Sequence, residues 1–370
     1  TRGSAVAPPR MNAPRVLVVG SVLSQPMGGV RRHNQEFLPR AARLLRERGG
    51  ALSVLAGRDG LAFDPGPQVD VLSSSAPAQP AALRAALESS AVQRALREAR
   101  ERGAPFDLVH TAHLPAPRSL EAPFTLTLHD LKSVLAPGEG GVRRFVGRCL
   151  LQDALKRAQR VIAVSRTLCD ELREHLGARP EQLAHAPNGC DHLPLEPRQA
   201  TADAALLFVG HLEPRKNLAL VLRALALAPD LGKLQLAGAP KGDERADLER
   251  LAHELGVAAR VEFLGLLSDA ELARHYARCR AVVLPSLREG FDIPLVEALR
   301  AGAPLACSDL AVHRELAGPH ARYFDPRSPE ALAAAVREAR APREAPQLAT
   351  WDDTARAYVE CWISAARPRA

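Results

Sequence analysis

The sequence predicts an α/β protein built from two similar domains, and three observations support this prediction. The chain has 370 residues, a length at which two domains are the natural expectation. Residues 15–20 and 205–210 each form an apolar run that ends in glycine and leads through a loop into a helical stretch. Around these repeats, short apolar runs alternate with longer segments of helical periodicity. Such alternation is typical of parallel sheets covered by helices, so we expect two Rossmann-like domains.

The first repeat opens on R-V-L-V-V-G, a run typical of a strand that is buried on both faces of a sheet. It leads into a loop that contains Gly28 and Gly29, and then into a helix expected at 30–48. The loop lacks the G-x-G-x-x-G pattern, so binding of a nicotinamide or flavin dinucleotide is weakly supported. Further strands are expected at 52–56, 107–110, 124–128 and 160–164, and helices at 80–102 and 142–159.

A polar, proline-rich stretch precedes the second repeat and has the composition of a linker. Near the C-terminus, Trp351, Tyr358 and Trp362 follow helical spacing and predict an apolar face with a packing role. The predicted organisation is a tag or disordered N-terminus at 1–14, a first domain at 15–192, a linker at 193–203, a second domain at 204–349 and a C-terminal helix at 350–370.

Composition narrows the classes of partner. Aromatic residues make up 4% of the chain, which argues against stacking platforms for single-stranded nucleic acid. The net charge of +7 favours anionic partners, such as nucleotide diphosphates or an acidic membrane surface, although a basic surface can also serve solubility alone. The six cysteines are far apart and form no C-x-x-C, so neither a zinc cluster nor a disulfide framework is indicated. We therefore expect reduced thiols in a cytoplasmic protein. No apolar run has the length of about 18 residues that a membrane span needs.

The most informative stretch is P-S-L-R-E-G-F-D-I-P-L-V-E-A-L-R-A-G-A-P at 285–304, which follows an apolar run at 281–284. Gly290 permits a tight turn, Asp292 is expected at a helix N-cap, and Pro294 suits the first turn of the helix. Glu289 then lies in the loop and Glu297 near the helix start, where anions collect. On these residues alone, an alternative is that the two acids merely favour the positive end of the helix.

Two further stretches carry candidate site residues. The second repeat continues as G-H-L-E-P-R-K-N from Gly210, which places Arg215 and Lys216 at a predicted helix start. Cations at that end oppose the helix dipole, so their placement indicates that an anion is expected, although a solvated basic pair is the alternative. In T-L-T-L-H-D-L, His129 follows a strand at the sheet edge where ligands bind in open α/β proteins. A strand-end histidine without a ligand is the alternative there.

Together these stretches resemble the GT4 family of retaining glycosyltransferases, whose GT-B fold has two Rossmann-like domains facing a central cleft. The family motif reads roughly E-G-F-G-x-P-x-x-E, and Asp292 departs from it because glycine is commoner at that place. The stretch from Gly210 resembles the family's G-R-L-x-x-x-K-N/G signature. V-I-A-V-S at 161–165 and P-N-G-C-D at 187–191 also resemble family segments, with Ser165 expected as an N-cap and Asn188-Gly189 as a turn. By the same resemblance, the C-terminal helix would cross back onto the first domain.

The resemblance implies a donor site for a nucleotide diphosphate sugar. Glu289 would contact hydroxyls of the donor sugar, Glu297 the ribose hydroxyls, and Arg215 with Lys216 the diphosphate. Gly28 and Gly29 would approach the diphosphate, and His129 would lie close to the transferred sugar. Backbone groups near Leu264 and Leu266 would contact the base, whose identity stays open among GDP, UDP and ADP. The remaining predicted donor-binding residues are Gly210, Gly290, Phe291, Asp292 and Ile293.

The implied activity moves a sugar to an acceptor hydroxyl of a glycan or lipid-linked glycan, as in polysaccharide biosynthesis. Among the possible donors, GDP-mannose, which would supply mannose, is favoured by the form of the stretches L-H-D-L and S-D-L-A-V-H-R-E. We expect neither a metal nor another cofactor, because the two cations can replace Mg²⁺. A catalytically silent nucleotide-sugar binding protein, supported by Asp292, stays open; a sugar phosphorylase is disfavoured by the short chain. Peripheral association with an anionic membrane, at its inner face, is an option raised by basic residues at Arg31, Arg32, Arg143, Arg144, Arg148, Lys156, Arg157 and Arg160.

Overall fold

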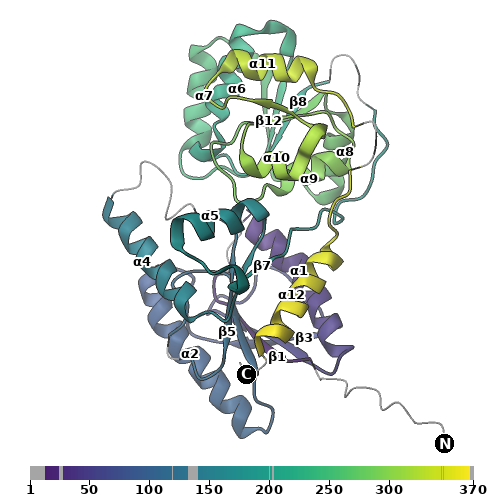
Figure 1. Cartoon of the computed structure of the whole chain (residues 1–370). Helices are drawn as coiled ribbons and strands as arrows, with labels where there is room; N and C mark the ends of the chain where they lie inside the picture. Colours follow the sequence, from purple (N-terminus) through teal and green to yellow (C-terminus); the bar gives the residue numbers. More distant parts are fainter. Residues whose placement is uncertain are drawn as a thin grey trace, which may run out of the picture. The chain divides into compact units, whose positions relative to one another are not determined.

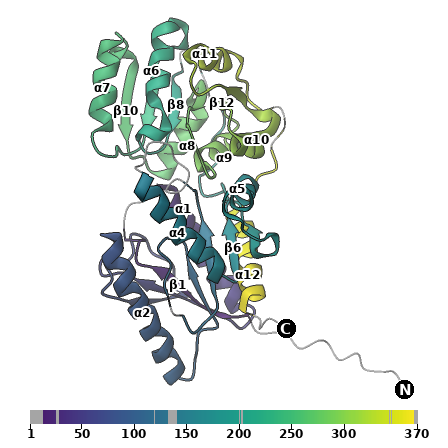
Figure 2. The ribbon, with the colours of Figure 1, turned by 60° about the vertical axis from the view of Figure 1, so that its left-hand side comes forward.

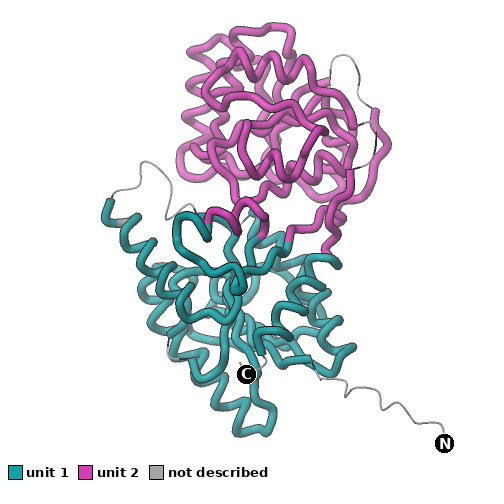
Figure 3. The backbone as a smooth tube through the Cα atoms, in the orientation of Figure 1, with its two compact units in different colours: residues 1–163, 172–186, 352–370 teal, residues 164–171, 187–351 magenta. Residues whose placement is uncertain are grey.

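The computed structural model describes residues 13–24, 28–118, 120–131, 141–199, 201, 204–342, 344 and 346–366. The chain divides into two compact units, drawn in two colours in Figure 3. The first comprises 1–163, 172–186 and 352–370, and the second comprises 164–171 and 187–351. The predicted boundary between the two domains was at residue 192, whereas residues 164–171 and 187–192 belong to the second unit. The C-terminal segment clusters with the first.

The first unit contains a seven-stranded parallel sheet in the order β3-β2-β1-β4-β5-β6-β7 (Figure 1). The strand order reverses between β1 and β4, which are direct neighbours. Nearly all residues of β1, β2, β4 and β5 are buried, and most of them are apolar, as expected for a sheet covered on both faces. The strands are β1 (Arg15–Gly20), β2 (Ala51–Ala56), β3 (Val69–Ser73), β4 (Leu108–Thr111), β5 (Phe124–Leu128), β6 (Arg160–Ala163) and β7 (Leu183–His185).

Helices cover both faces of this sheet. Figures 1 and 2 show α2 and α4 on one face and α1 with α12 on the other, as right-handed crossovers require for the sequential helices. Tyr358 and Trp362 of α12 are buried and pack against Phe37 of α1, so the predicted packing role of this face is confirmed. The helices are α1 (Gly28–Arg46), α2 (Ala81–Glu101), α4 (Gly141–Arg157), α5 (Arg166–Leu176), the 3₁₀ turn η1 (Pro180–Gln182) and α12 (Trp351–Ala366).

The second unit contains a six-stranded parallel sheet in the order β10-β9-β8-β11-β12-β13. Here the strand order reverses between β8 and β11, and the loops after these two strands carry most of the predicted site. Ligands of open α/β sheets bind at such a reversal, outside the carboxyl ends of the strands. The strands are β8 (Leu206–Val209), β9 (Leu234–Ala237), β10 (Val261–Gly265), β11 (Ala281–Leu284), β12 (Leu305–Ser308) and β13 (Arg322–Phe324).

The helices of the second unit pack in two groups: α6 contacts α7 and α11, and α9 contacts α10. Gly238 marks the tight passage between β9 and the loop after β8, because a Cβ there would meet the carbonyl of Gly210 at 1.9 Å. The helical segments are η2 (Pro214–Lys216), α6 (Leu218–Leu227), η3 (Pro229–Leu231), α7 (Glu244–Glu254), η4 (Ala258–Arg260), α8 (Asp269–Arg278), α9 (Ile293–Arg300), α10 (Ala311–Ala317), η5 (Gly318–His320) and α11 (Pro329–Glu338).

The predicted strands and long helices occur within a few residues of their expected ends, and the exceptions have physical causes. The strands β3, β7, β12 and β13 were not predicted. For the edge strand β3, the side chains are mostly exposed and include polar residues. Gly28 and Gly29 were expected in a loop but begin α1, so that prediction of a loop was wrong. Ser165 is an N-cap as predicted, because its Oγ accepts from the backbone N–H of Leu168 at 3.1 Å.

Candidate functional site

Two loops of the second unit meet beyond the carboxyl ends of β8 and β11. The loop after β8 closes in the 3₁₀ turn η2, and the loop after β11 leads into α9. The backbone N–H of Leu287 donates to the carbonyl of Arg215 at 2.9 Å. The Arg215 guanidinium in turn donates from Nη1 to the carbonyl of Arg288 at 2.8 Å. These bonds tie the basic stretch and the acidic stretch into one structure.

Ion pairs join the predicted charged residues. Glu289 lies with Oε2 2.6 Å from Nη1 of Arg215 and with Oε1 2.8 Å from Nζ of Lys216. Glu213 binds Nη2 of Arg215 at 2.7 Å and Nζ of Lys241 at 2.9 Å. The side chain of Lys216 is 8% exposed and that of Arg215 is 24% exposed, so the guanidinium keeps an open side.

Burial by itself lowers the pKa of both cations. For Lys216 the nearby carboxylates of Asp292 and Glu289 outweigh burial and raise the pKa. For Arg215 the pairs with Glu289 and Glu213 have the same effect and raise the pKa. Both groups are therefore firmly charged, which is the state that binds an anion.

Buried polar atoms near these loops lack hydrogen-bond partners among the described residues. They include Nε of Arg215, Oγ of Ser286 directly after β11, and Oγ of Ser308 at the end of β12. Oε1 of Glu289 also accepts no well-aligned hydrogen bond there, although it is paired with Lys216. A buried polar group without a partner costs about 1–3 kcal/mol, so a polar ligand at this edge would relieve a cost that the protein now carries.

Asp292 departs from its expected role. It occupies the N-cap position of α9 with φ of 102°, and among the described residues its carboxylate makes no hydrogen bond to the first helical turn. The predicted N-cap position is therefore confirmed, but the side chain does not cap α9. The buried carboxylate instead lies 3.4 Å from Nζ of Lys216 and 3.2 Å from Nε2 of His313. A positive φ suits glycine and is tolerated by aspartate, which explains why glycine is the easier residue here.

Glu297 of α9 is buried in a separate hydrogen-bonded group. Oε2 accepts from the hydroxyl of Tyr276 at 2.7 Å, and Oε1 lies 2.8 Å from Nε2 of His192. The indole N–H of Trp351 donates to Nδ1 of His192 at 3.0 Å, so Nε2 of that ring carries the proton that bonds Glu297. These contacts fix the orientation of the carboxylate. His192 and Tyr276 were not predicted, because neither lies in a motif.

The remaining predicted residues of the second unit have varied surroundings. Gly210 has φ of 144°, and a Cβ there would lie 3.5 Å from Cε of Lys216, so glycine keeps room for that side chain. Gly290 accepts a hydrogen bond from Oγ of Ser165 at 2.7 Å, which anchors the turn. Phe291 and Ile293 are buried and hold the start of α9. Leu264 lies in β10, and Leu266 is 78% exposed just beyond it.

The first unit holds His129, directly after β5. Nε2 of this ring is buried and has no hydrogen-bond partner among the described residues. Burial lowers the pKa of His129 to about 4, against the opposing charge of Asp130, so the ring is neutral at neutral pH. The rings of His129 and His33 form a T-shaped pair with centroids 4.8 Å apart, and the hydroxyl of Tyr358 hydrogen-bonds with Nε2 of His33 at 2.9 Å. Gly28 and Gly29 are exposed at the start of α1.

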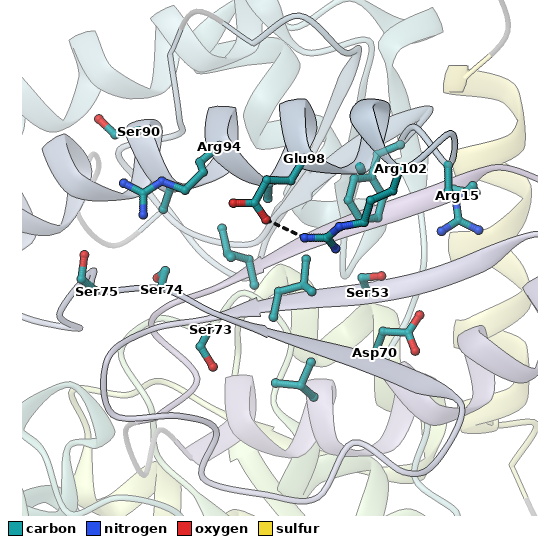
Figure 4. Close-up of a pocket in the computed structure, with 18 of the residues that line it drawn as sticks. Arg15, Ser53, Asp70, Ser73, Ser74, Ser75, Ser90, Arg94, Glu98 and Arg102 are labelled. Atoms are coloured by element: carbon teal, nitrogen blue, oxygen red, sulfur yellow. Dashed lines mark hydrogen bonds and ion pairs between the residues drawn. The ribbon is translucent and has the colours of Figure 1, made fainter.

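A cavity of about 500 Å³ lies elsewhere in the first unit, between α2 and the strands β2 and β3. Figure 4 shows Arg94 and Glu98 of α2 and Arg102 directly after it above the cavity, and Ser73 and Ser74 below, with Glu98 and Arg102 paired at 2.9 Å. The described residues that line it include none of the predicted site residues.

Neither metal sites nor membrane spans emerge from the described part of the chain. Among these residues, no group of three or more His, Cys, Asp and Glu side chains is placed to hold a metal ion. No described helix combines the length and the apolar character that crossing a membrane demands.

Comparisons with known proteins agree with the two-unit architecture. A family model described as "Glycosyltransferase Family 4" matches residues 27–192, and one described as "Glycosyl transferases group 1" matches residues 196–356. The solved structure of sucrose-phosphate synthase from Thermosynechococcus elongatus superposes with a TM-score of 0.69 and 20% identity. The match covers 95% of this chain and 94% of the synthase chain. That of WaaG, a glycosyltransferase involved in lipopolysaccharide biosynthesis, covers 93% and 95%, with a TM-score of 0.66 and 20% identity. The GT-B fold is thus confirmed.

The similarity to curated relatives covers only part of each relative's length. The chain is 29% identical to the MMP α-(1→4)-mannosyltransferase of Mycolicibacterium hassiacum over 66% of its own length and 59% of the relative. It is 26% identical to the O-antigen chain mannosyltransferase RfbU of Salmonella typhimurium over 58% of its own length and 60% of the relative. The chain therefore spans about 60% of the length of each of these two relatives.

Proposed function

The chain belongs to the family 4 and group 1 glycosyltransferases and resembles their mannosyltransferase members; on that premise we propose a retaining enzyme that uses a nucleotide diphosphate sugar. The acceptor is a hydroxyl of a glycan or lipid-linked glycan. The observation that carries the proposal is the group of Arg215, Lys216 and Glu289 beside the N-terminus of α9. Firmly charged cations at a helix N-terminus suit a diphosphate.

In this proposal catalysis is mainly electrostatic. Arg215 and Lys216 stabilise the charge that grows on the departing diphosphate, assisted by the positive end of α9. Glu289 is displaced from its ion pairs and accepts hydrogen bonds from hydroxyls of the donor sugar. Glu297, held by Tyr276 and His192, receives the ribose hydroxyls. The departing diphosphate takes the proton of the acceptor hydroxyl, so no side chain is assigned as general base.

The first unit contributes by resemblance. The resemblance assigns His129 to the transferred sugar, and a neutral ring would orient the sugar's hydroxyls rather than protonate them. Gly28 and Gly29 offer backbone N–H groups at the start of α1, where a helix collects anions. In the second unit, Leu264 and Leu266 border the base. The site functions without a metal, because two fixed cations supply the charge that Mg²⁺ supplies elsewhere.

A mannosyl donor, GDP-mannose, is the first candidate. Both relatives described above are mannosyltransferases, and RfbU acts on O-antigen chains. One solved structure of the Anabaena protein HepE is a complex with UDP and glucose. It has a TM-score of 0.61 and 20% identity to this chain. Donor choice is therefore tested with GDP, UDP and ADP together rather than with one base.

A lipid-linked acceptor is supported by the first turns of α4. Val142, Phe145 and Val146 are 79%, 68% and 48% exposed and share one helical face. Arg144 and Arg148 flank them, as in helices that lie on anionic bilayers. We expect salt-sensitive sedimentation with phosphatidylglycerol vesicles, weakened in Phe145→Glu and absent with phosphatidylcholine. Equal sedimentation with both lipids, or none, removes the membrane from the proposal.

The experiment for the activity has two stages. Melting curves of the full chain with GDP, UDP and ADP identify the base, because a bound ligand raises the melting temperature by mass action. Turnover of the matching sugar donor is then followed by release of the nucleoside diphosphate. Lys216→Ala and Glu297→Ala are expected to lose most turnover while remaining folded, whereas Lys233→Ala, at an exposed position outside the site, keeps it. Near-normal turnover in the first two variants contradicts the site, and binding without turnover identifies a silent binding protein.

A further inference from the structure

A buried histidine stands behind the predicted anion site. His313 of α10 and Asp292 are both fully buried, with Nε2 and Oδ2 3.2 Å apart. The other oxygen of Asp292 faces Nζ of Lys216 at 3.4 Å. One aspartate therefore joins His313 to a cation that the proposed function assigns to the diphosphate.

The ring of His313 is bonded in a way that requires both protons. Nδ1 lies 2.9 Å from the backbone carbonyl of Ser308, and a carbonyl only accepts, so Nδ1 carries a proton. Nε2 faces the carboxylate of Asp292, which also accepts. Burial by itself lowers the pKa of His313, but the hydrogen bonds with Asp292 and with the Cys307 thiol raise it to about 10. The side chain is therefore an imidazolium ion at neutral pH.

The charge balance of the buried group depends on that imidazolium. The described ionic contacts connect four cations, Arg215, Lys216, Lys241 and His313, with three carboxylates, those of Glu213, Glu289 and Asp292. With a neutral residue in place of His313, the buried carboxylate of Asp292 would keep Lys216 as its one described ionic contact, and Lys216 also pairs with Glu289. A glycine at 292 would need no compensation and would also suit the positive φ.

We propose that His313 is a positioning residue of the donor site, whose charge neutralises Asp292 and so leaves Lys216 and Arg215 free to bind a diphosphate. The inference rests on the proposed function and assigns to the S-D-L-A-V-H-R-E stretch a role in binding. His313 acts through Asp292, and Asp292 with its histidine takes the place of a single glycine. The aspartate is thereby compatible with an active enzyme.

A double-mutant cycle tests this role. His313→Gln, Asp292→Gly and the double variant are compared for binding of the nucleoside diphosphate that the unmodified chain prefers, and of the matching uncharged nucleoside, by calorimetry. His313→Gln is expected to weaken diphosphate binding about tenfold, because one nearby positive charge is lost. Binding of the uncharged nucleoside should stay unchanged. In the Asp292→Gly background the same substitution is expected to change diphosphate binding less than about threefold, because no carboxylate is left uncompensated.

Three results overturn the inference. Unchanged diphosphate binding in His313→Gln does so, and so does an equal loss in the Asp292→Gly background, which indicates a structural role only. If His313→Gln does not fold, the titration of the His313 ring in the unmodified chain decides by NMR: an imidazolium at pH 7 supports the inference and a neutral ring overturns it. Absence of diphosphate binding in the unmodified chain is a different failure, because it removes the proposed function first.

Discussion

The hydroxyl of Tyr276 offers a clean perturbation of the predicted site. This side chain comes from α8, is fully buried, and donates to Oε2 of Glu297 at 2.7 Å. Tyr276→Phe removes the hydroxyl and keeps the ring, so packing is conserved. Glu297 then retains the contact with His192 and loses its second hydrogen bond.

The expected loss follows from the type of bond. A hydrogen bond to a charged group contributes about 1.5–3 kcal/mol, and here the acceptor stays buried after its donor is removed. We therefore expect the free energy of unfolding to fall by about 2 kcal/mol. With a urea m-value of about 2 kcal/mol/M, the midpoint of the transition moves down by about 1 M. Trp351 reports the transition, because its indole bonds His192 in the same group.

The control is Tyr323→Phe in the same unit. Its hydroxyl donates to the neutral carbonyl of Gly318 at 2.5 Å, so the loss should stay near 1 kcal/mol. The decisive comparison places Tyr276→Phe in a Glu297→Gln background, where the charged acceptor is gone and the loss should shrink by half or more. An equal loss in both backgrounds, or a midpoint within about 0.2 M of the unmodified chain, refutes the reasoning.

Two further predictions concern pH and close packing. The folded-state pKa of His313 is raised from 6.5 to about 10, so its contribution to stability is complete below pH 6.5 and is lost as pH rises through 10. The folded-state pKa of Asp292 is lowered from 3.8 to about 2, so its contribution to stability is complete above pH 3.8 and is lost as pH falls through 2. Urea midpoints between pH 4 and 10 should show an alkaline decline that is smaller in His313→Gln, and an unchanged decline contradicts the assignment. Gly189→Ala should destabilise the chain by at least about 3 kcal/mol, because its Cβ would lie 2.2 Å from the backbone nitrogen of Trp351. Gly141→Ala, where a Cβ meets open space, should change thermal stability little, and equal melting temperatures for the two variants would refute the packing argument.

Local patterns predicted the elements that carry the site. Apolar runs before Gly210 and before the Glu289 loop identify strands, and parallel strands bring their carboxyl ends to one edge. That argument is enough to expect Arg215, Lys216 and Glu289 near one another, and the structure joins them. It also predicted Ser165 as a cap, since capping depends on neighbours within one turn.

Such local patterns could not predict which residues contact the charged side chains. His192 and Tyr276 meet Glu297 from 105 and 21 residues away in sequence, and no local spacing records those contacts. The N-cap position of Asp292 was predicted, but the contacts of its side chain were missed for the same reason. Capping requires an extended backbone, but this residue has a positive φ and its carboxylate is drawn to Lys216 and His313.

By itself the sequence determined that this chain forms two parallel sheets and that acids and bases follow β8 and β11, because hydrophobic periodicity and loop chemistry are written in neighbouring residues. Only the tertiary structure decided which charges neutralise one another. Electrostatic pairing depends on distance in space and on burial, and both are set by helices that arrive from elsewhere in the chain. The imidazolium of His313 is the clearest case: its sequence neighbours give no sign of the aspartate that keeps it charged.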